Sequence, residues 1–120
     1  MINKQFAQRF AKEWIAAWNA QDMDRILAHY DDDFEMSSPI IVLRVGEESG
    51  KLKGKAAVGA YWTSALESYP DLHFELIDVF LGVDSIVIYY DGVRGASAEV
   101  FHFNELGKVS HAFANYSLDS

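Results

Sequence analysis

Two carboxyl groups, those of Glu99 and Asp78, are the candidates for proton-transfer chemistry in this sequence. Each lies in a segment with the two-residue alternation of a strand. Asp78 shares one face of its strand with Phe74, Leu76 and Phe80, and Glu99 shares one face with Phe101 and Phe103. If that face is buried, both carboxyls point into an aromatic pocket. Burial raises the pKa of a carboxyl and makes general acid or base catalysis possible near neutral pH. Alternatively, one or both carboxyls lie at the rim of a sheet and pair with Arg94, Arg44 or water.

Histidine chemistry and metal binding have less support. The four histidines, at positions 29, 73, 102 and 111, include no pair with the spacing of metal ligands on one helix. We expect His102 on the outward face of its strand, and His29 and His73 on the surface. His111 would point inward only if the last strand has the reverse of the phase we expect. The sequence has no cysteine, no Gly-rich phosphate loop and no serine-centred nucleophile motif, so we expect no metal and no cofactor.

Apolar periodicity predicts the elements that position these residues. Phe6, Phe10, Trp14 and Trp18 recur every four residues, which indicates an amphipathic helix ending near residues 19–21. A shorter helix follows, and a third helix precedes Pro70. After Pro70 the apolar period changes to two, which is typical of strands. The expected strands are residues 34–38, 40–45, 72–81, 85–94, 97–103 and 109–117, with a polar loop at 46–54.

The order of these elements predicts an α+β fold in a single domain, residues 1–120. Three N-terminal helices should pack on one face of a curved, mainly antiparallel sheet of about five or six strands. Asp91 and Gly92 form either a hairpin turn or a bulge before a turn at Gly95. The strand at 85–94 is apolar on both faces, so both faces need a cover. The helices cover one, and we expect a second copy to cover the other, which gives a homodimer through the sheet face.

The net charge of −8 argues against a nucleic-acid partner, because a phosphate-binding surface needs clustered Lys and Arg. The basic residues are scattered, except for Lys51, Lys53 and Lys55 in the polar loop. The N-terminus lacks an apolar signal core, and no apolar run approaches the length of a membrane span. We therefore expect a cytoplasmic protein with no nucleic-acid or membrane partner.

Three stretches of the sequence together form a recognisable pattern. They are Trp18-Asn19-Ala20-Gln21-Asp22 with Leu27, Tyr30, Asp33 and Ser37-Ser38-Pro39; Gly54-Lys55-Ala56-Ala57-Val58 with Tyr61-Trp62; and Glu99-Val100-Phe101-His102-Phe103-Asn104 with Gly107-Lys108-Val109. This pattern resembles the nuclear transport factor 2-like superfamily, and its SnoaL-like bacterial branch in particular. The resemblance implies a cone-shaped roll with an internal pocket. It implies little about the reaction, because the superfamily includes isomerases, dehydratases, cyclases and proteins without a catalytic role.

Within this superfamily, the spacing is similar to that of ketosteroid isomerase, which uses an aspartate base and an oxyanion hole of a tyrosine and a protonated aspartate. The base position is Ser38 here, the tyrosine position is Trp14, and the protonated-acid position is Glu99. A supporting tyrosine becomes Trp62, and another is kept as Tyr30. Serine cannot abstract a carbon-bound proton unaided, so we expect no ketosteroid isomerase activity.

The resemblance also implies which residues line the pocket, although aromatic residues at helical spacing more often form the core. The expected ligand-binding residues are Trp14, Trp18, Tyr30, Ser38, Tyr61, Trp62, Phe74 and Phe101. Three hypotheses remain open. The chain is an enzyme that performs cofactor-free proton transfer on a small hydrophobic carbonyl compound, using Glu99 with Asp78 or Ser38. Alternatively, it is a non-catalytic binding protein, or a dimeric scaffold whose pocket is filled by Trp14 and Trp62.

Overall fold

The computed structural model describes residues 1–119, which contain four helices and six strands. The helices are α1 (Lys4–Asn19), α2 (Met23–Leu27), α3 (Pro39–Val45) and α4 (Lys55–Ser68). The strands are β1 (Tyr30–Ser37), β2 (Lys51–Lys53), β3 (Glu75–Leu81), β4 (Ser85–Gly92), β5 (Gly95–Phe103) and β6 (Val109–Tyr116). Among the described residues, no helix combines the length and the apolar character that a membrane span requires.

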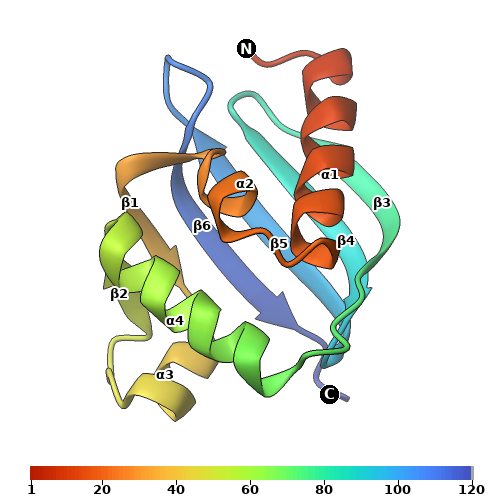
Figure 1. Cartoon of the computed structure of the whole chain (residues 1–120). Coiled ribbons are helices and arrows are strands. Elements are labelled where there is room, and N and C mark those ends of the chain that lie inside the picture. The colour runs from red at the N-terminus through yellow and green to blue at the C-terminus, as the bar shows by residue number, and fades with distance from the viewer. Residues whose placement is uncertain (120) are drawn as a thin grey trace.

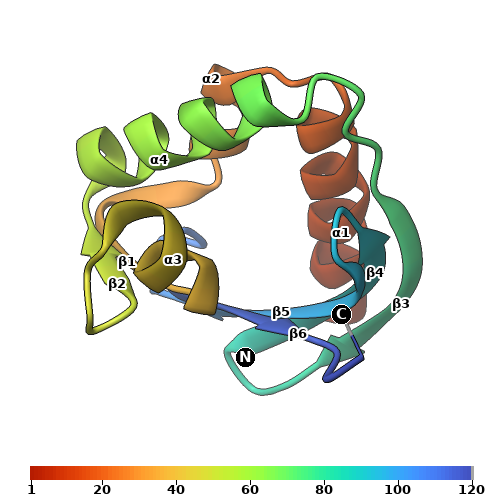
Figure 2. The same ribbon diagram turned by 90° about the horizontal axis from the view of Figure 1, so that it is seen from below.

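The six strands form one curved sheet in the order β2-β1-β6-β5-β4-β3. Neighbouring strands are antiparallel except β1 and β6, which are parallel. Helices α1, α2 and α4 lie on one face of this sheet (Figure 1). Seen from below, α4 lies opposite β5 and β6, and α1 lies along one flank beside β3 and β4, where the sheet curves (Figure 2). This arrangement confirms the predicted α+β fold with helices on a mainly antiparallel sheet.

Helix α1 supplies the helical half of the core, as its periodicity predicts. The Asn3 side chain caps its first turn by accepting a hydrogen bond from the Phe6 N–H at 2.9 Å. Phe10, Trp14 and Trp18 are buried along one face, and alanines beside them allow close packing. On β5, Phe101 and Phe103 face inward and alternate with less buried residues. Both rings pack edge-on against Phe10 of α1. The buried aromatic stripe therefore anchors α1 against the sheet.

The segment at 40–45, expected to be a strand, is a helix in the structure. Its first and last residues explain the difference. The Ser38 hydroxyl accepts a hydrogen bond from the Ile40 N–H, Pro39 occupies the first helical position, and Gly46 ends the helix with a φ of 78°. These are strong signals for a helix start and stop. They outweigh the modest penalty that β-branched residues carry in a helix.

Two further expectations about the loops change. The polar loop at 46–54 contains the short strand β2, which pairs with the end of β1. The turn between β4 and β5 consists of Val93 and Arg94, because Gly92 pairs with Gly95 across the two strands. This two-residue connection replaces both alternatives that the sequence left open, a turn at Asp91-Gly92 and a turn at Gly95. It places Arg94 at the tip of the hairpin.

Candidate functional site

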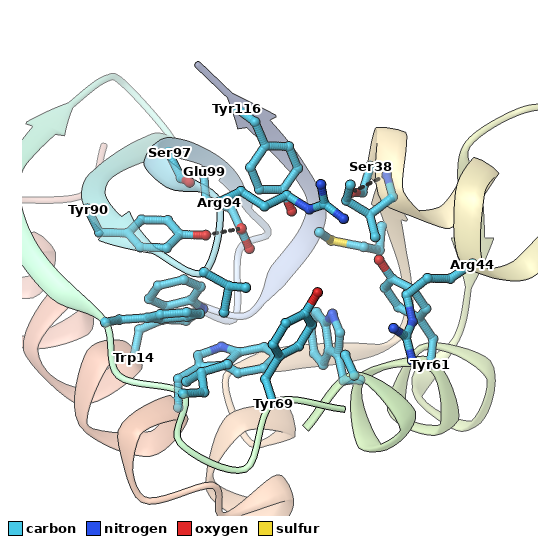
Figure 3. Close-up of a pocket in the computed structure, with 18 residues that line it drawn as sticks. Trp14, Ser38, Arg44, Tyr61, Tyr69, Tyr90, Arg94, Ser97, Glu99 and Tyr116 are labelled. Carbon is cyan, nitrogen blue, oxygen red and sulfur yellow. Dashed lines mark hydrogen bonds between the residues drawn. The ribbon is translucent and has the colours of Figure 1, made fainter. Parts of the chain in front are cut away.

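A pocket lies between α1, α4 and the inner face of the sheet, and α3 and the β4–β5 hairpin form part of its rim (Figure 3). Its volume is about 110 Å³. A protein cavity of about 150 Å³ is known to bind benzene. The pocket therefore encloses a chemical group of roughly that size or smaller, and a larger ligand must extend through the mouth.

Most of the expected site residues line this pocket. They are Trp14, Trp18, Ser38, Tyr61, Trp62, Phe74 and Glu99. Two expected ligand contacts, Tyr30 and Phe101, lie outside the lining and belong to the core. Tyr30 is buried behind Trp14, whose indole N–H donates a hydrogen bond to the Tyr30 hydroxyl at 3.0 Å. Phe101 packs edge-on against the Trp14 ring, with 5.4 Å between ring centroids.

The expectation that Asp78 shares the pocket with Glu99 is wrong. Asp78 is exposed and accepts a hydrogen bond from the backbone N–H of Val79, its own neighbour. A bulge in β3 between residues 76 and 78 shifts the pairing by one residue, so Asp78 lies opposite the half-buried Tyr89, and Val79 takes the position opposite buried Ile88. A shift of one residue turns every following side chain to the other face of a sheet.

The inner end of the pocket is an aromatic cluster. Trp14 lies 5.7 Å from Phe74 and 5.2 Å from Tyr90, measured between ring centroids. Trp18 contacts both Phe74 and Trp62. Phe74 is held in place by Asn19 at the end of α1, whose side chain donates to the Phe74 carbonyl at 2.9 Å and accepts from its N–H at 2.6 Å. The floor is thus built from side chains that pack on one another.

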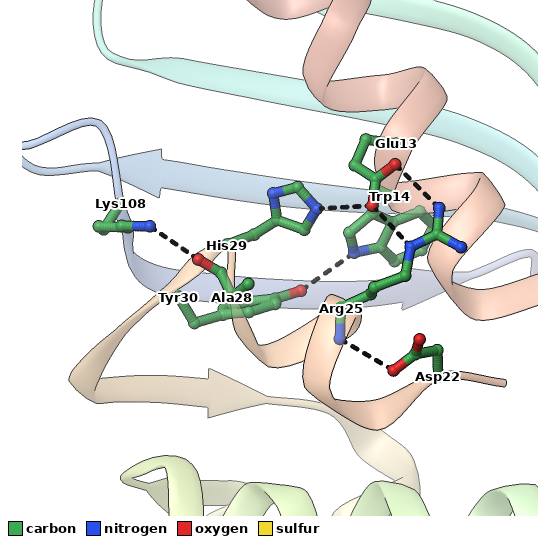
Figure 4. A network of polar contacts seen from close by, with 8 residues as sticks. All are labelled: Glu13, Trp14, Asp22, Arg25, Ala28, His29, Tyr30 and Lys108. Atoms are coloured by element: carbon green, nitrogen blue, oxygen red, sulfur yellow. Dashed lines mark hydrogen bonds and ion pairs between the residues drawn. The ribbon is translucent and has the colours of Figure 1, made fainter. Parts of the chain in front are cut away.

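Polar contacts join α1 to α2 and to the segment that enters β1 (Figure 4). Arg25 of α2 donates two hydrogen bonds to the Glu13 carboxylate of α1, at 3.0 and 3.1 Å. His29 contacts both this ion pair and the core: its Nε2 lies 3.9 Å from the Glu13 carboxylate, and its ring is edge-on to Phe10. Burial lowers the pKa of His29, which is half-buried rather than on the surface as expected. These contacts join α1 to α2 and to the residue before β1, and the hydrogen bond from Trp14 to Tyr30 joins α1 to β1 itself.

Glu99 is the carboxyl group that the pocket contains. Its side chain projects from β5 into the pocket and is only 5% exposed. The Tyr90 hydroxyl donates a hydrogen bond to Glu99 Oε1 at 3.4 Å. Burial raises the pKa of Glu99 from 4.5 to about 7, and the hydrogen bond from Tyr90 offsets part of that shift. The carboxyl can therefore donate or accept a proton near neutral pH.

The sheet register explains the polar residues around Glu99. Tyr90, Ser97 and Tyr116 are cross-strand neighbours on β4, β5 and β6. Glu99 follows Ser97 by two residues on β5, so its side chain lies on the same face of the sheet as these three residues. Sequence reasoning missed Tyr90 and Tyr116 as site residues. Their alternation in phase with the buried Ile88 and Ala114 was the available signal, but only the register shows that they surround Glu99.

A second polar group lies across the pocket from Glu99. Ser38, the residue that caps α3, is buried and interacts with the hydroxyls of Tyr61 on α4 and Tyr116 on β6. Burial raises the pKa of Tyr116 to about 12 and also raises that of Tyr61, while interaction with the Ser38 hydroxyl lowers both. Both phenols therefore remain neutral hydrogen-bond donors at physiological pH.

Two arginines stand at the rim. The Arg44 guanidinium donates hydrogen bonds through one nitrogen to Ser64 and Ser68 of α4. Arg94, at the hairpin tip, extends below Tyr116 toward Ser38 (Figure 3). Its positive charge lowers the pKa of both Tyr61 and Tyr116. Neither arginine forms an ion pair within residues 1–119, so neither is the partner of Glu99 or Asp78 that the sequence allowed.

The histidines lie away from the pocket. His102 and His111 are exposed, and the buried residues that alternate with them show that both point outward. Ala112 and Ala114 face inward instead, which settles the phase of the last strand. Within residues 1–119, no three His, Cys, Asp or Glu side chains gather as metal ligands would. The pocket thus offers one carboxyl, several phenols and two guanidinium groups for chemistry.

Known proteins resemble this chain in sequence and fold. Residues 11–112 match the family model of the SnoaL-like domain. The crystal structure of a SnoaL-like protein of unknown function from Burkholderia thailandensis E264 shares 56% sequence identity. That alignment covers 97% of this chain and 98% of the other, with a TM-score of 0.94. Among proteins of curated function, none matches the sequence significantly.

More distant structures share the fold alone. A SnoaL-like family protein from Agrobacterium tumefaciens C58, named as a candidate isomerase, is 15% identical over 92% of this chain and 96% of that one, with a TM-score of 0.72. A protein of unknown function with a cystatin-like fold, from Methylobium petroleophilum PM1, is 14% identical over 97% of this chain and 78% of that one, with a TM-score of 0.76. The chain and these structures therefore have one architecture in common.

Proposed function

The chain belongs to the SnoaL-like family, and we propose that its pocket catalyses cofactor-independent proton transfer on a small hydrophobic carbonyl compound, with Glu99 as the proton-transferring group. One observation carries this proposal. Glu99 is buried in an open aromatic pocket, and its pKa of about 7 gives comparable populations of acid and base at neutral pH. General acid–base catalysis is most effective when the pKa of the catalytic group lies near the working pH.

The remaining polar groups fit the same chemistry. In its ionised form, Glu99 removes a proton from the carbon next to the substrate carbonyl, and the negative charge moves to the carbonyl oxygen. The neutral hydroxyls of Tyr61 and Tyr116 can donate hydrogen bonds to that oxygen, as the donors of an oxyanion hole do. Glu99 then returns the proton to the same or another carbon, or to a departing hydroxyl. These outcomes correspond to exchange, isomerisation and dehydration.

A steroid does not suit this pocket. The base position of ketosteroid isomerase holds Ser38, whose hydroxyl already accepts the Ile40 N–H and contacts two phenols. The enclosed volume of about 110 Å³ is smaller than the cavity that holds one benzene ring. We propose a substrate whose buried part has about four to six carbon atoms.

Non-catalytic binding is the second candidate, and the loss of Asp78 from the pocket favours it. With one carboxyl rather than two, the pocket lacks a separate acid and base. Its floor of packed rings also suits an apolar ligand held without reaction. The catalytic and the binding functions differ in whether the protein accelerates the exchange of protons at the carbon next to the ligand's carbonyl group.

Deuterium exchange separates them. We would follow the protons next to the carbonyl of 3-methyl-2-butanone in D₂O by NMR, with wild-type protein, Glu99→Gln and the control Asp78→Asn. The proposal predicts acceleration by the wild type, a loss of about 100-fold or more in Glu99→Gln, and no change in Asp78→Asn. Equal rates for wild type and Glu99→Gln would leave only the binding function.

We also propose that the chain forms a homodimer through the outer face of its sheet. Phe80, Val87, Val100 and Phe113 are successive cross-strand neighbours on that face, and Phe80 is half exposed. An apolar row across four strands needs a cover, and a second copy supplies a self-complementary one. Light scattering at micromolar concentration tests this, and a monomer mass would contradict it. The cytoplasmic location and the absence of a nucleic-acid partner stay predictions of the sequence.

A further inference from the structure

We propose that the pocket selects small apolar 2-oxo acids, with the carboxylate at Arg94, the neighbouring carbonyl at Tyr61 and Tyr116, and the apolar group on the aromatic floor. The inference names the substrate class of the site described above and rests on the proposed function, because it brings the substrate's acidic C–H to Glu99. It is carried by the arrangement of charged, polar and apolar groups from the rim to the floor of the pocket.

The rim carries positive charge that nothing in the described chain neutralises. Arg94 forms no ion pair or hydrogen bond within residues 1–119, and Arg44 uses one nitrogen for serine contacts and leaves its other N–H groups without partners there. The carboxyl group of the lining, that of Glu99, is buried and is largely neutral at slightly acid pH. A guanidinium offers a planar set of donors that matches a carboxylate.

This placement contrasts with the charge of the whole protein. The chain has 18 Asp and Glu residues against 10 Lys and Arg, and its net charge is −8. An anionic ligand is repelled by most of such a surface. Two arginines at the mouth of one pocket therefore mark a place where an anion is attracted rather than repelled.

From the rim toward the floor of the pocket, the lining changes from hydrogen-bond donors to apolar rings. The Tyr61 and Tyr116 hydroxyls lie within the electrostatic reach of Arg94, since its charge lowers the pKa of both. Below them, Trp14, Phe74 and Tyr90 form the floor with Glu99 beside it. A 2-oxo acid has the same sequence of groups: a carboxylate, a carbonyl one bond away, and an apolar group whose first carbon carries the acidic proton.

The proton-transfer step is balanced without a further reactant. The ionised Glu99 takes the proton from the carbon next to the keto group, and the C–H electron pair forms the C=C bond of the enolate. The enolate oxygen accepts hydrogen bonds from the two phenols. Return of the proton to the carbon restores the oxo acid, and its return to the oxygen gives the enol.

Binding measurements test the carboxylate site. The probes are 3-methylbutanoate and 3-methylbutanamide, which have the same size and differ in charge. All three tryptophans of the chain line the pocket, so intrinsic fluorescence reports occupancy. We expect the carboxylate to bind at least about tenfold more tightly than the amide, and Arg94→Gln to remove that difference while amide binding is unchanged. Arg9→Gln, an exposed arginine of α1 outside the pocket, is the control and should change neither.

Exchange kinetics test the oxo acid as substrate. The proton at C3 of 3-methyl-2-oxobutanoate should exchange with a higher kcat/KM than the corresponding proton of 3-methyl-2-butanone, and Arg94→Gln should raise KM for the oxo acid alone. If the ketone exchanges through Glu99 but the carboxylate binds no tighter than the amide, this inference fails and the proposed function stands. If the carboxylate binds through Arg94 but Glu99→Gln leaves exchange unchanged, the proposed function fails, and with it the assignment of oxo acids as substrates. No binding of the carboxylate to the wild type overturns the inference.

Discussion

The Tyr90 hydroxyl and the Glu99 carboxyl meet across two adjoining strands, with 3.4 Å between the phenol oxygen and Glu99 Oε1. The two residues are diagonal rather than direct neighbours, since Tyr90 pairs with Ser97 and Glu99 with Ile88. Burial shifts the equilibrium of Glu99 toward the neutral acid, and the phenol shifts it back toward the carboxylate. The balance of these two effects sets the carboxyl near neutral pH, where it can transfer protons in both directions.

Replacing Tyr90 with phenylalanine should raise the pKa of Glu99 above its wild-type value. The donated hydrogen bond stabilises the ionised carboxyl, and its removal leaves burial unopposed. Carbon-13 NMR of the glutamate side-chain carboxyls over pH 4–10 measures the change, with Glu99→Gln identifying the resonance. The same pKa in both proteins would show that the 3.4 Å contact has no energetic role.

The contribution of Glu99 to the stability of the protein should fall between about pH 4.5 and pH 7. In that range the unfolded chain has released the Glu99 proton, while the folded chain keeps it, so rising pH favours unfolding. A shift from 4.5 to about 7 corresponds to about 3 kcal/mol, present as stability below pH 4.5 and lost above pH 7. Urea unfolding of wild type and Glu99→Gln at pH 4.5 and pH 8 tests this. The stability of the variant relative to wild type should rise with pH, and a constant difference would contradict the account.

Substitution of Gly92 by alanine should loosen the wall that holds Tyr90. A methyl group at this position would lie 2.8 Å from Tyr90 Cε2 and 3.4 Å from Phe74 Cε1. The first distance is too short for a van der Waals contact, so the buried Tyr90 ring must move, at a cost of about 1–3 kcal/mol. Urea unfolding measures the loss of stability, and the Glu99 titration should change with it. A loss below about 0.5 kcal/mol would show that the rings yield freely.

An aspartate in place of Ser38 should increase proton transfer. Asp caps a helix as well as Ser does, so α3 should keep its first turn. The new carboxylate would supply a separate base across the pocket from Glu99, which could then act as the acid. We expect the exchange rate of 3-methyl-2-butanone to rise by about tenfold or more. An unchanged rate in a folded variant would mean that position 38 does not reach the substrate.

The sequence predicts the fold class, α1 and the inward direction of Glu99, because each depends on a regular apolar period. Prediction from the sequence fails where a local feature overrides that period. The bulge at residues 76–78 turns Asp78 outward, and the alternation of residues in that segment does not indicate a bulge. At 40–45, the β-branched residues suggest a strand, whereas Ser38, Pro39 and Gly46 cap a helix. The capping residues of this helix stand in the sequence, but they flank a run of β-branched residues whose local preference is for a strand.

The polar residues of the site depend on strand register, which a single sequence does not specify. Tyr90 and Tyr116 become neighbours of Glu99 only when β4, β5 and β6 pair as they do. Arg94 reaches the rim only because the hairpin turns at residues 93–94 and not two residues earlier. These residues supply most of the chemistry that the pocket offers beyond Glu99.

The pKa of Glu99 in the wild-type protein tests the central claim most directly. Carbon-13 NMR of the side-chain carboxyls, with the Glu99 resonance assigned by its loss in Glu99→Gln, would follow the titration in the folded protein. We expect a midpoint near pH 7 for Glu99. A midpoint near 4.5 would show an ordinary carboxylate that is ionised at neutral pH, and would contradict a role for Glu99 in transferring protons in both directions.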